Sequence, residues 1–192
     1  MAIPDAGIVL VRHGEGTHNV GDFYSGDPSQ PGYVEAHLTE SGEQQVIETA
    51  QRLRETGIEG DVVLKVICSP LPRTCETLDI LIKQLSVPQA RLTTDNRLIE
   101  AGMGLREGQR ISQYNEADSW FPSHPEAFGG ETRAQIRQRV VSLFNALLDQ
   151  YHDQKGYIIL VSHGSPLYLL LEAVTGSPEK LPTAGYKILP LK

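Results

Sequence analysis

Cysteine is scarce in this 192-residue chain, in which only Cys68 and Cys75 are present. Two cysteines are too few for the disulfide framework of a small secreted domain. Neither they nor the six histidines show the paired spacing of a zinc site. We therefore expect a reduced protein that requires neither a metal ion nor a cofactor.

Long apolar runs are also missing from the sequence. No stretch approaches the ~20 consecutive apolar residues that cross a bilayer. The first residues, Met1 to Asp5, lack the basic and apolar regions of a signal peptide. The sequence therefore predicts a cytoplasmic protein with no membrane partner.

Positive charge is in deficit, since 17 Lys and Arg residues face 24 Asp and Glu residues and the net charge is −7. A negative overall field disfavours binding to nucleic acid. It does not exclude a small anionic substrate, because a local cluster of arginines can override the average inside a cleft. The length and the ordinary composition fit one domain over residues 1–192.

Two short apolar runs each end in a His-Gly pair. Residues 8–14 read Ile-Val-Leu-Val-Arg-His-Gly, and residues 158–164 read Ile-Ile-Leu-Val-Ser-His-Gly. Continuous apolarity without alternation indicates strands covered on both faces, as in a parallel sheet. Ligands of such sheets bind just outside the carboxyl ends of the strands. If the two strands are neighbours, His13 and His163 meet in that crevice.

Strands and helices are expected to alternate along the chain. We expect strands near residues 7–11, 62–68, 87–94, 157–161 and 186–191, and helices near 39–57, 70–85, 131–152 and 165–175. Residues 14–37 form a long polar loop, and residues 106–130 form a small lid-like insertion without a clear period. This alternation predicts an α/β fold of three layers, with a mostly parallel sheet and helices on both of its faces.

Four cationic or imidazole side chains lie at, or a few residues beyond, the ends of predicted strands. They are Arg12, His13, Arg73 and His163. The planar fork of arginine matches phosphate oxygens, and the start of a helix after Gly164 would add backbone N–H donors. Phosphate is a better fit than carboxylate, because the site offers more donors than two oxygens need.

A histidine in such a site has two possible functions. It binds the anion as imidazolium, or it attacks phosphorus as a neutral imidazole. Neighbouring positive charge disfavours protonation and therefore favours the nucleophile. The leaving alkoxide then needs a proton, for which Glu100, in a Gly-rich loop after a predicted strand, is the candidate donor. Glu107, seven residues further along the sequence, is the alternative candidate for this proton donor.

The motifs that carry this chemistry resemble the histidine phosphatase superfamily, whose fold is phosphoglycerate mutase-like. In chain order they are Arg12-His13-Gly14-Glu15 with Asn19, Leu38-Thr39-x-x-Gly42 with Gln45, Ser69-Pro70-Leu71-x-Arg73-Thr74, Leu98-x-Glu100, Gly129-Gly130-Glu131 and Val161-Ser162-His163-Gly164. Each motif is weak by itself, but together and in this order they are specific.

The resemblance implies that His13 is phosphorylated and that Glu100 donates the proton and later activates water. It also implies a phosphate pocket and a set of substrate contacts. The pocket comprises Arg12, Arg73, His163 and Asn19, and the substrate contacts are Ser25, Gly26, Gly164 and Ser165.

The sequence departs from the family's pattern at Gly16-Thr17-His18, and the insertion at residues 106–130 is short. A small lid leaves a phosphoenzyme open to water, so we favour a phosphoric monoester hydrolase acting on a small phosphorylated metabolite. The alternatives are a phosphoglycerate-type phosphomutase and a phosphate-binding regulatory module without turnover.

Four further side chains have two possible placements. Tyr114, Trp120 and Phe121 either line the substrate mouth or form a small core of the lid. His18 either alters substrate contacts or is a loop residue that faces solvent or accepts local hydrogen bonds.

Overall fold

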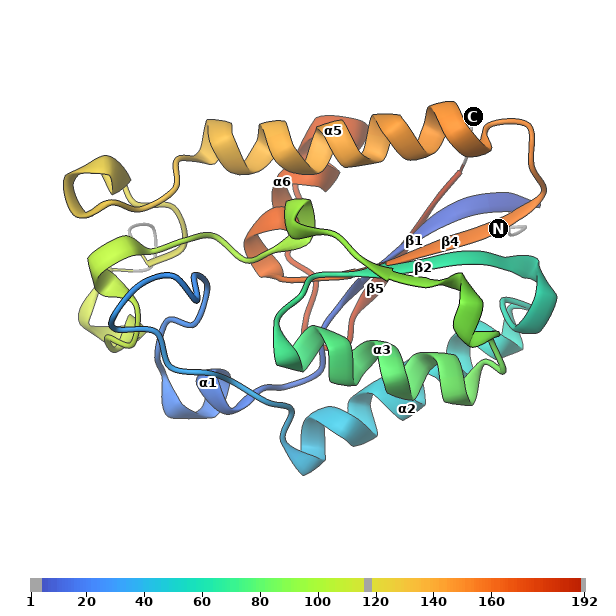
Figure 1. Cartoon of the computed structure of the whole chain (residues 1–192), viewed down its shortest axis with the longest axis horizontal. Coiled ribbons are helices and arrows are strands. Elements are labelled where there is room, and N and C mark those ends of the chain that lie inside the picture. The colour runs from blue at the N-terminus through green and yellow to red at the C-terminus, as the bar shows by residue number, and fades with distance from the viewer. Residues whose placement is uncertain (1–4, 116–118, 191–192) are drawn as a thin grey trace.

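A mostly parallel sheet forms the centre of the molecule (Figure 1). The computed structural model describes residues 5–115 and 119–190, and within them the sheet has five strands in the order β3-β2-β4-β1-β5. The strands are β1 (Ala6–Arg12), β2 (Val63–Cys68), β3 (Leu92–Thr94), β4 (Gly156–Ser162) and β5 (Tyr186–Pro190). β5 is an antiparallel edge strand, and the other pairs are parallel. The predicted α/β fold class is confirmed.

The two apolar runs that end in His-Gly are neighbouring strands. β1 and β4 pair in parallel from Ala6 opposite Gly156 to Arg12 opposite Ser162. His13 and His163 therefore leave the sheet side by side at its carboxyl edge. The backbone agrees, because His13 N donates to Ser162 O at 3.0 Å.

Four helices cover the two faces of this sheet (Figure 1). α2 (Glu40–Glu55) and α3 (Pro72–Gln84) lie on one face, and α5 (Arg133–Tyr151) and α6 (Gly164–Thr175) lie on the other. Alternate side chains of β1 serve the two faces: Val9 and Val11 pack with α2 and α3, whereas Ile8 and Leu10 pack with α5 and α6. Every residue of β4 is buried, as its unbroken apolar run predicts.

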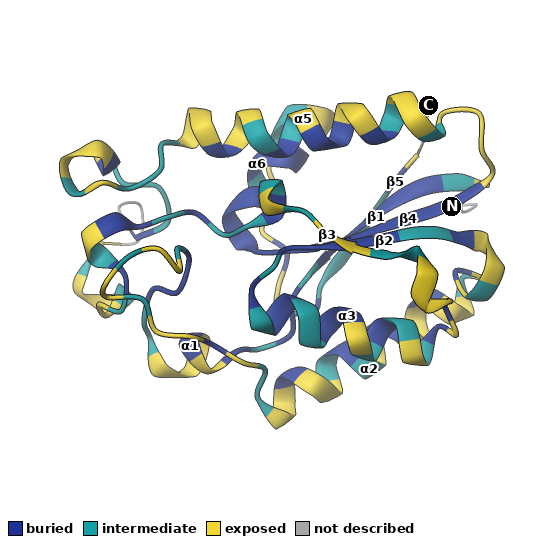
Figure 2. Ribbon diagram, viewed as in Figure 1, coloured by how far each residue is buried: buried dark blue, intermediate teal, exposed yellow. Residues whose placement is uncertain are grey.

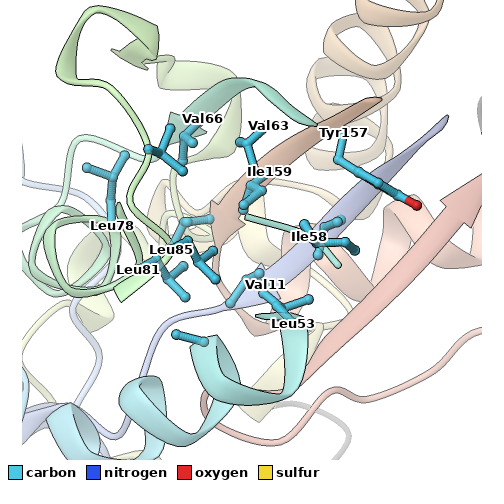
Figure 3. Close-up of a cluster of buried hydrophobic side chains, with 14 of the residues drawn as sticks. Val11, Leu53, Ile58, Val63, Val66, Leu78, Leu81, Leu85, Tyr157 and Ile159 are labelled. Atoms are coloured by element: carbon cyan, nitrogen blue, oxygen red, sulfur yellow. The ribbon is translucent and has the colours of Figure 1, made fainter. Parts of the chain in front are cut away.

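The α2–α3 side of the core is a closely packed apolar cluster, part of which is drawn in Figure 3. Leu53 of α2 and Leu81 of α3 meet Val11 and Ile159 of the central strands with no exposed surface. Burying one such aliphatic side chain contributes about 1.5–3 kcal/mol. Packing against α2 and α3 therefore holds the strand ends that precede the histidines in place. In Figure 2 the buried residues, in dark blue, run along the strands and the inner sides of the helices.

Helix boundaries follow local capping signals. Thr39 caps α2, since its Oγ1 accepts from Gly42 N at 3.0 Å. Thr132 caps α5 in a reciprocal pair with Gln135, so this helix begins two residues later than expected. α6 begins at Gly164 instead of Ser165, with His163 itself as the N-cap.

The loop predicted over residues 14–37 contains a short helix, α1 (Thr17–Gly21). A helix of this length is too short to show a periodic pattern and is stabilised by its surroundings. The region predicted as a lid forms short 3₁₀ turns, among them Ile111–Gln113 and Pro125–Phe128. Backbone hydrogen bonds between Tyr24 and residues 108 and 109 join the loop to the lid at one end of the molecule.

No helix in the described ranges, 5–115 and 119–190, is long and apolar enough to cross a membrane.

Candidate active site

A cavity of about 120 Å³ opens at the carboxyl edge of β1 and β4. We call it the strand-end cavity; Arg12, Arg73, Glu100 and Trp120 are among the residues that line it. The sheet supplies Arg12, the first turn of α3 supplies Arg73, and the loop after β3 supplies Glu100. The polar groups predicted from separate motifs therefore converge on one place.

His13 is 1% exposed and is not itself among the residues that line the cavity. Its Nδ1 is 2.7 Å from Gly14 O, and because a carbonyl only accepts, Nδ1 carries the proton. Arg73 Nε donates to His13 Nε2 at 3.4 Å, which agrees with a lone pair on Nε2. Burial, followed by the positive charge of Arg73, lowers the pKa of His13 well below its usual value. The structure therefore presents a neutral imidazole whose Nε2 lone pair accepts one long hydrogen bond from Arg73.

His163 lies beside it, with the ring centroids 5.1 Å apart in an edge-on arrangement. Its Nε2 is 2.7 Å from Ser69 Oγ, at the start of the loop between β2 and α3. Burial, followed by Arg73, lowers the pKa of His163 as well. The Nδ1 atom is buried and has no partner.

Arg73 has no exposed surface and is the largest fully buried side chain. Its Nη2 donates to Ser25 O at 2.8 Å, and its Nε faces His13. Burial lowers its pKa to about 10, so the guanidinium remains charged at neutral pH. Arg73 is therefore held inside the protein and does not lie on the outer surface of α3.

Unpartnered buried polar atoms concentrate at this site. Of the four found among the described residues, three are Arg12 Nε, His18 Nδ1 and His163 Nδ1. Each buried polar atom left without a partner costs about 1–3 kcal/mol. Arg12 keeps one hydrogen bond, from Nη1 to Leu181 O at 2.8 Å, while its Nε has none. A bound anion would give the Arg12 and His163 donors the partners they lack.

The two candidate acids have different surroundings. Glu100 is half-buried, lines the cavity, and interacts electrostatically with Arg12 and Arg73. Its Oε1 also accepts from Ala101 N at 2.8 Å. Of the two carboxylates, Glu100 is therefore the one placed to meet a ligand.

Glu107 is 3% exposed and is not part of the cavity wall. Its carboxylate accepts backbone N–H groups from Gly26 at 2.8 Å, Met103 at 2.9 Å and Asp27 at 3.1 Å. Burial raises its pKa, and these hydrogen bonds act in the opposite direction. Glu107 therefore ties the loop after β1 to the loop after β3 and positions both.

The four residues expected to contact substrate all line the cavity, namely Ser25, Gly26, Gly164 and Ser165, and so does Asn19 of the expected phosphate pocket. Two of them have their polar groups engaged within the protein: Gly26 N donates to Glu107, and Ser25 Oγ donates to Val34 O at 2.8 Å. Gly164 and Ser165 begin α6, whose positive end favours an anion. These two residues offer the more direct contact.

His18 is buried at 8% exposure, so a solvent-facing loop position is wrong for it. The short helix α1 turns its ring to 5.3 Å from the ring of His13, and its Nε2 is 3.1 Å from Asn19 Nδ2. Burial lowers its pKa to about 2. The only signal in the sequence was its place between the His-Gly pair and Asn19.

The three lid aromatics divide between the two predicted placements. Trp120 lines the cavity, where a Cβ on Gly164 would lie 3.1 Å from its ring. Tyr114 and Phe121 instead pack against a small cluster that includes Met103. Trp120 therefore takes the predicted place at the mouth of the cavity, and Tyr114 and Phe121 take the predicted place in a small core of the lid.

Among residues 5–115 and 119–190, no three His, Cys, Asp or Glu side chains are grouped so that they could hold a metal ion.

A mostly parallel sheet flanked by helices, with two imidazoles and two arginines at its carboxyl edge, has the donors that a phosphate group needs. Residues 8–185 match the family model described as "Histidine phosphatase superfamily (branch 1)", and the chain belongs to this superfamily.

Its curated relatives include a probable phosphoglycerate mutase, GpmB, of Proteus mirabilis. This protein is 30% identical over an alignment of 178 positions, which covers 89% of this chain and 75% of the relative. The mitochondrial serine/threonine-protein phosphatase Pgam5 of Drosophila ananassae is 32% identical over 90% of this chain. The chain covers 52% of that protein, about half its length.

Solved structures with the same fold also include both activities. The mycobacterial glucosyl-3-phosphoglycerate phosphatase superposes with a TM-score of 0.71 at 22% identity, covering 95% of this chain and 88% of that one. A phosphoglycerate mutase from Bacillus anthracis gives a TM-score of 0.74 at 14% identity, covering 97% and 88%. At these identities the likeness establishes the fold.

Proposed function

We propose that the protein is a phosphoric monoester hydrolase that acts through a phosphohistidine at His13 and needs no metal ion. One observation carries the proposal: the neutral His13 Nε2 lies against the guanidinium of Arg73, which shares a cavity with Arg12 and Glu100. Nucleophile, charge stabilisers and proton donor are thus within one small volume. Core packing alone gives no reason to place two arginines, one of them fully buried, beside three imidazoles.

The first half-reaction transfers the phosphoryl group to the protein. Arg12, Arg73 and the first turn of α6 bind the phosphate oxygens, which replace the long contact between Arg73 and His13. His13 Nε2 attacks phosphorus as the bond to the ester oxygen breaks, and His163 Nδ1 donates to an equatorial oxygen. Glu100 gives its proton to the departing alkoxide.

The second half-reaction regenerates the free protein. Glu100, now ionised, takes a proton from a water molecule that attacks phosphorus and breaks the bond to Nε2. Inorganic phosphate leaves, and His13 is neutral again. Asn19 and Ser165 complete the phosphate site in this scheme.

The lining of the cavity favours hydrolysis over the mutase reaction. It includes the apolar side chains of Phe23, Met103, Ile111 and Trp120, whereas Arg12 and Arg73 are the only Lys or Arg side chains among the described lining residues. A phosphoglycerate carries a carboxylate that would need further cationic partners. An uncharged organic leaving group with apolar surface fits this lining better.

The test is turnover of 4-nitrophenyl phosphate in the presence of a chelator. His13→Ala should lose at least about 10⁴-fold in kcat and all acid-labile labelling by a ³²P-phosphoryl substrate. His124→Ala, in which an exposed histidine is changed, should retain both.

Unchanged hydrolysis by the His13 variant, or loss of wild-type activity with the chelator, contradicts the mechanism. Isomerisation of a phosphoglycerate without release of phosphate would establish the mutase instead. An inactive wild-type protein that still binds phosphate would establish the binding module.

A further inference from the structure

The only two cysteines of the chain face each other next to the candidate active site. Cys68 is the last residue of β2, and Cys75 lies in the first turn of α3. Their Sγ atoms are 3.9 Å apart, which is van der Waals contact between reduced thiols. A disulfide has an S–S bond of about 2.05 Å, so the sulfurs must approach by roughly 1.9 Å to form one.

The segment between these cysteines carries two groups that hold the imidazoles. Ser69 Oγ is 2.7 Å from His163 Nε2, and Arg73 Nε is 3.4 Å from His13 Nε2. The segment is also tied to Cys75, whose thiol donates to Ser69 O at 3.6 Å. A change in the distance between the two sulfurs therefore acts directly on the residues that position the site.

We propose that Cys68 and Cys75 form an oxidation site, at which a hydroperoxide closes an intrachain disulfide that lowers turnover at the neighbouring phosphate site. The site accepts a small peroxide because Cys75 is partly exposed while Cys68 is 2% exposed. The exposed sulfur meets the oxidant, and the buried sulfur resolves the product.

The chemistry balances in two steps. The Cys75 thiolate attacks one peroxide oxygen, the O–O bond breaks, and Cys75 sulfenic acid and hydroxide form. Cys68 sulfur then attacks the sulfenic sulfur, the S–O bond breaks, and the thiol proton leaves with the hydroxyl group as water. The hydroxide takes up the proton that Cys75 released on ionisation. The two thiols together lose two electrons, and one molecule of hydrogen peroxide is reduced to two molecules of water.

The surroundings of the two cysteines support Cys75 as the attacking thiolate and Cys68 as the resolving thiol. The hydrogen bond from Cys68 lowers the pKa of the Cys75 thiol, and the same contact, together with burial, raises the pKa of Cys68. A thiolate is the reactive form of cysteine, so Cys75 is the attacking sulfur. The Sγ atom of Cys68, the resolving thiol, is in van der Waals contact with the Sγ atom of Cys75.

Closing the bridge perturbs the active site through its two ends. The end of β2 and the first turn of α3 must approach each other, and the hydrogen bond from the Cys75 thiol to Ser69 O is lost. Displacement of a positioning group by 1 Å can cost on the order of 10²-fold in rate. We expect kcat to fall at least about tenfold, and a reductant to restore it.

The test combines mass spectrometry with the phosphatase assay on the intact protein. Limiting hydrogen peroxide should remove about 2 Da from the wild-type mass, abolish both free thiols without forming dimers, and lower kcat. Dithiothreitol should reverse all three changes. The mass and thiol measurements do not depend on the proposed hydrolysis, so failure of that function is distinguishable from failure of the disulfide.

Two variants make the outcome decisive. Cys75→Ser should keep the basal activity and resist peroxide, and Cys68→Ala serves as an independent variant without a resolving thiol. Oxidation of Met103, which lines the cavity, would inactivate wild type and both variants alike and would not respond to dithiothreitol. That result, the absence of the 2 Da loss, or a disulfide without change in kcat would each overturn the proposal.

Discussion

The imidazole rings of His13 and His163 lie 5.1 Å apart because β1 and β4 are adjacent parallel strands that end in register. Two chain segments 150 residues apart are thereby brought to one edge of the sheet. Arg12 opposite Ser162 is the last pair of this ladder, so each histidine is the first residue beyond its strand. The sheet register sets the distance between the proposed nucleophile and its neighbour.

Glu100 and Glu107 should be distinguishable by the leaving group of the substrate. Glu100→Gln should lower kcat/KM, which reports phosphoryl transfer to His13, by about 10²–10⁴-fold on an alkyl phosphate and much less on 4-nitrophenyl phosphate, whose phenolate leaves without a proton. Because Glu100 also activates water in the second half-reaction, kcat should fall on both substrates. Glu107→Gln should lower both activities by the same factor. It should also reduce the free energy of unfolding by about 1–3 kcal/mol, because an amide cannot accept all three backbone N–H groups.

Steady-state kinetics on the two substrates and urea denaturation provide the readouts. A leaving-group dependence in the Glu107 variant and none in the Glu100 variant would exchange the two roles.

Trp120 should select for the organic part of the substrate. Trp120→Ala should reduce the ratio of kcat/KM for an aryl phosphate to that for glycerol phosphate about tenfold, which corresponds to about 1.4 kcal/mol of lost apolar contact. Leu105→Ala is the matched control, because this exposed residue belongs to the same region but does not line the cavity. An unchanged ratio in the Trp120 variant would remove the lid aromatic from substrate recognition.

Stability should fall as pH decreases below about 6.5, in part because His13, His18 and His163 are buried as neutral imidazoles. Their pKa values are lowered in the folded state, that of His18 to about 2, so only the unfolded chain binds these protons as pH falls. Above about 6.5 neither state is protonated and the effect vanishes. Each of these imidazoles therefore lowers the free energy of unfolding by about 1.4 kcal/mol when the pH falls from 7.5 to 5.5.

Urea denaturation at the two pH values isolates one of these groups. His18→Phe should lose about 1.4 kcal/mol less than wild type over this interval. His152→Asn, in which an exposed histidine is changed, should behave as wild type does. Equal pH dependence of wild type and the His18 variant would contradict the neutral burial of His18.

The alternation of strands and helices could be predicted because each element carries a local pattern. The apolar runs of β1 and β4 and the capping residue Thr39 are signals read within a few residues of one another. Element ends moved by one or two residues where a cap replaced the expected start, as at Thr132. The short helix α1 carried no such pattern, because five residues complete too little of a period.

The sequence by itself determined the order of the polar motifs and the apolar runs that make His13 and His163 leave the sheet together. Only the tertiary structure decided that Arg73 is buried, that Glu100 and not Glu107 meets the cavity, and that Cys68 touches Cys75. The physical reason is that local pattern depends on neighbours in the chain. Burial, charge pairing and sulfur contact depend on which loops the packed sheet brings to one edge.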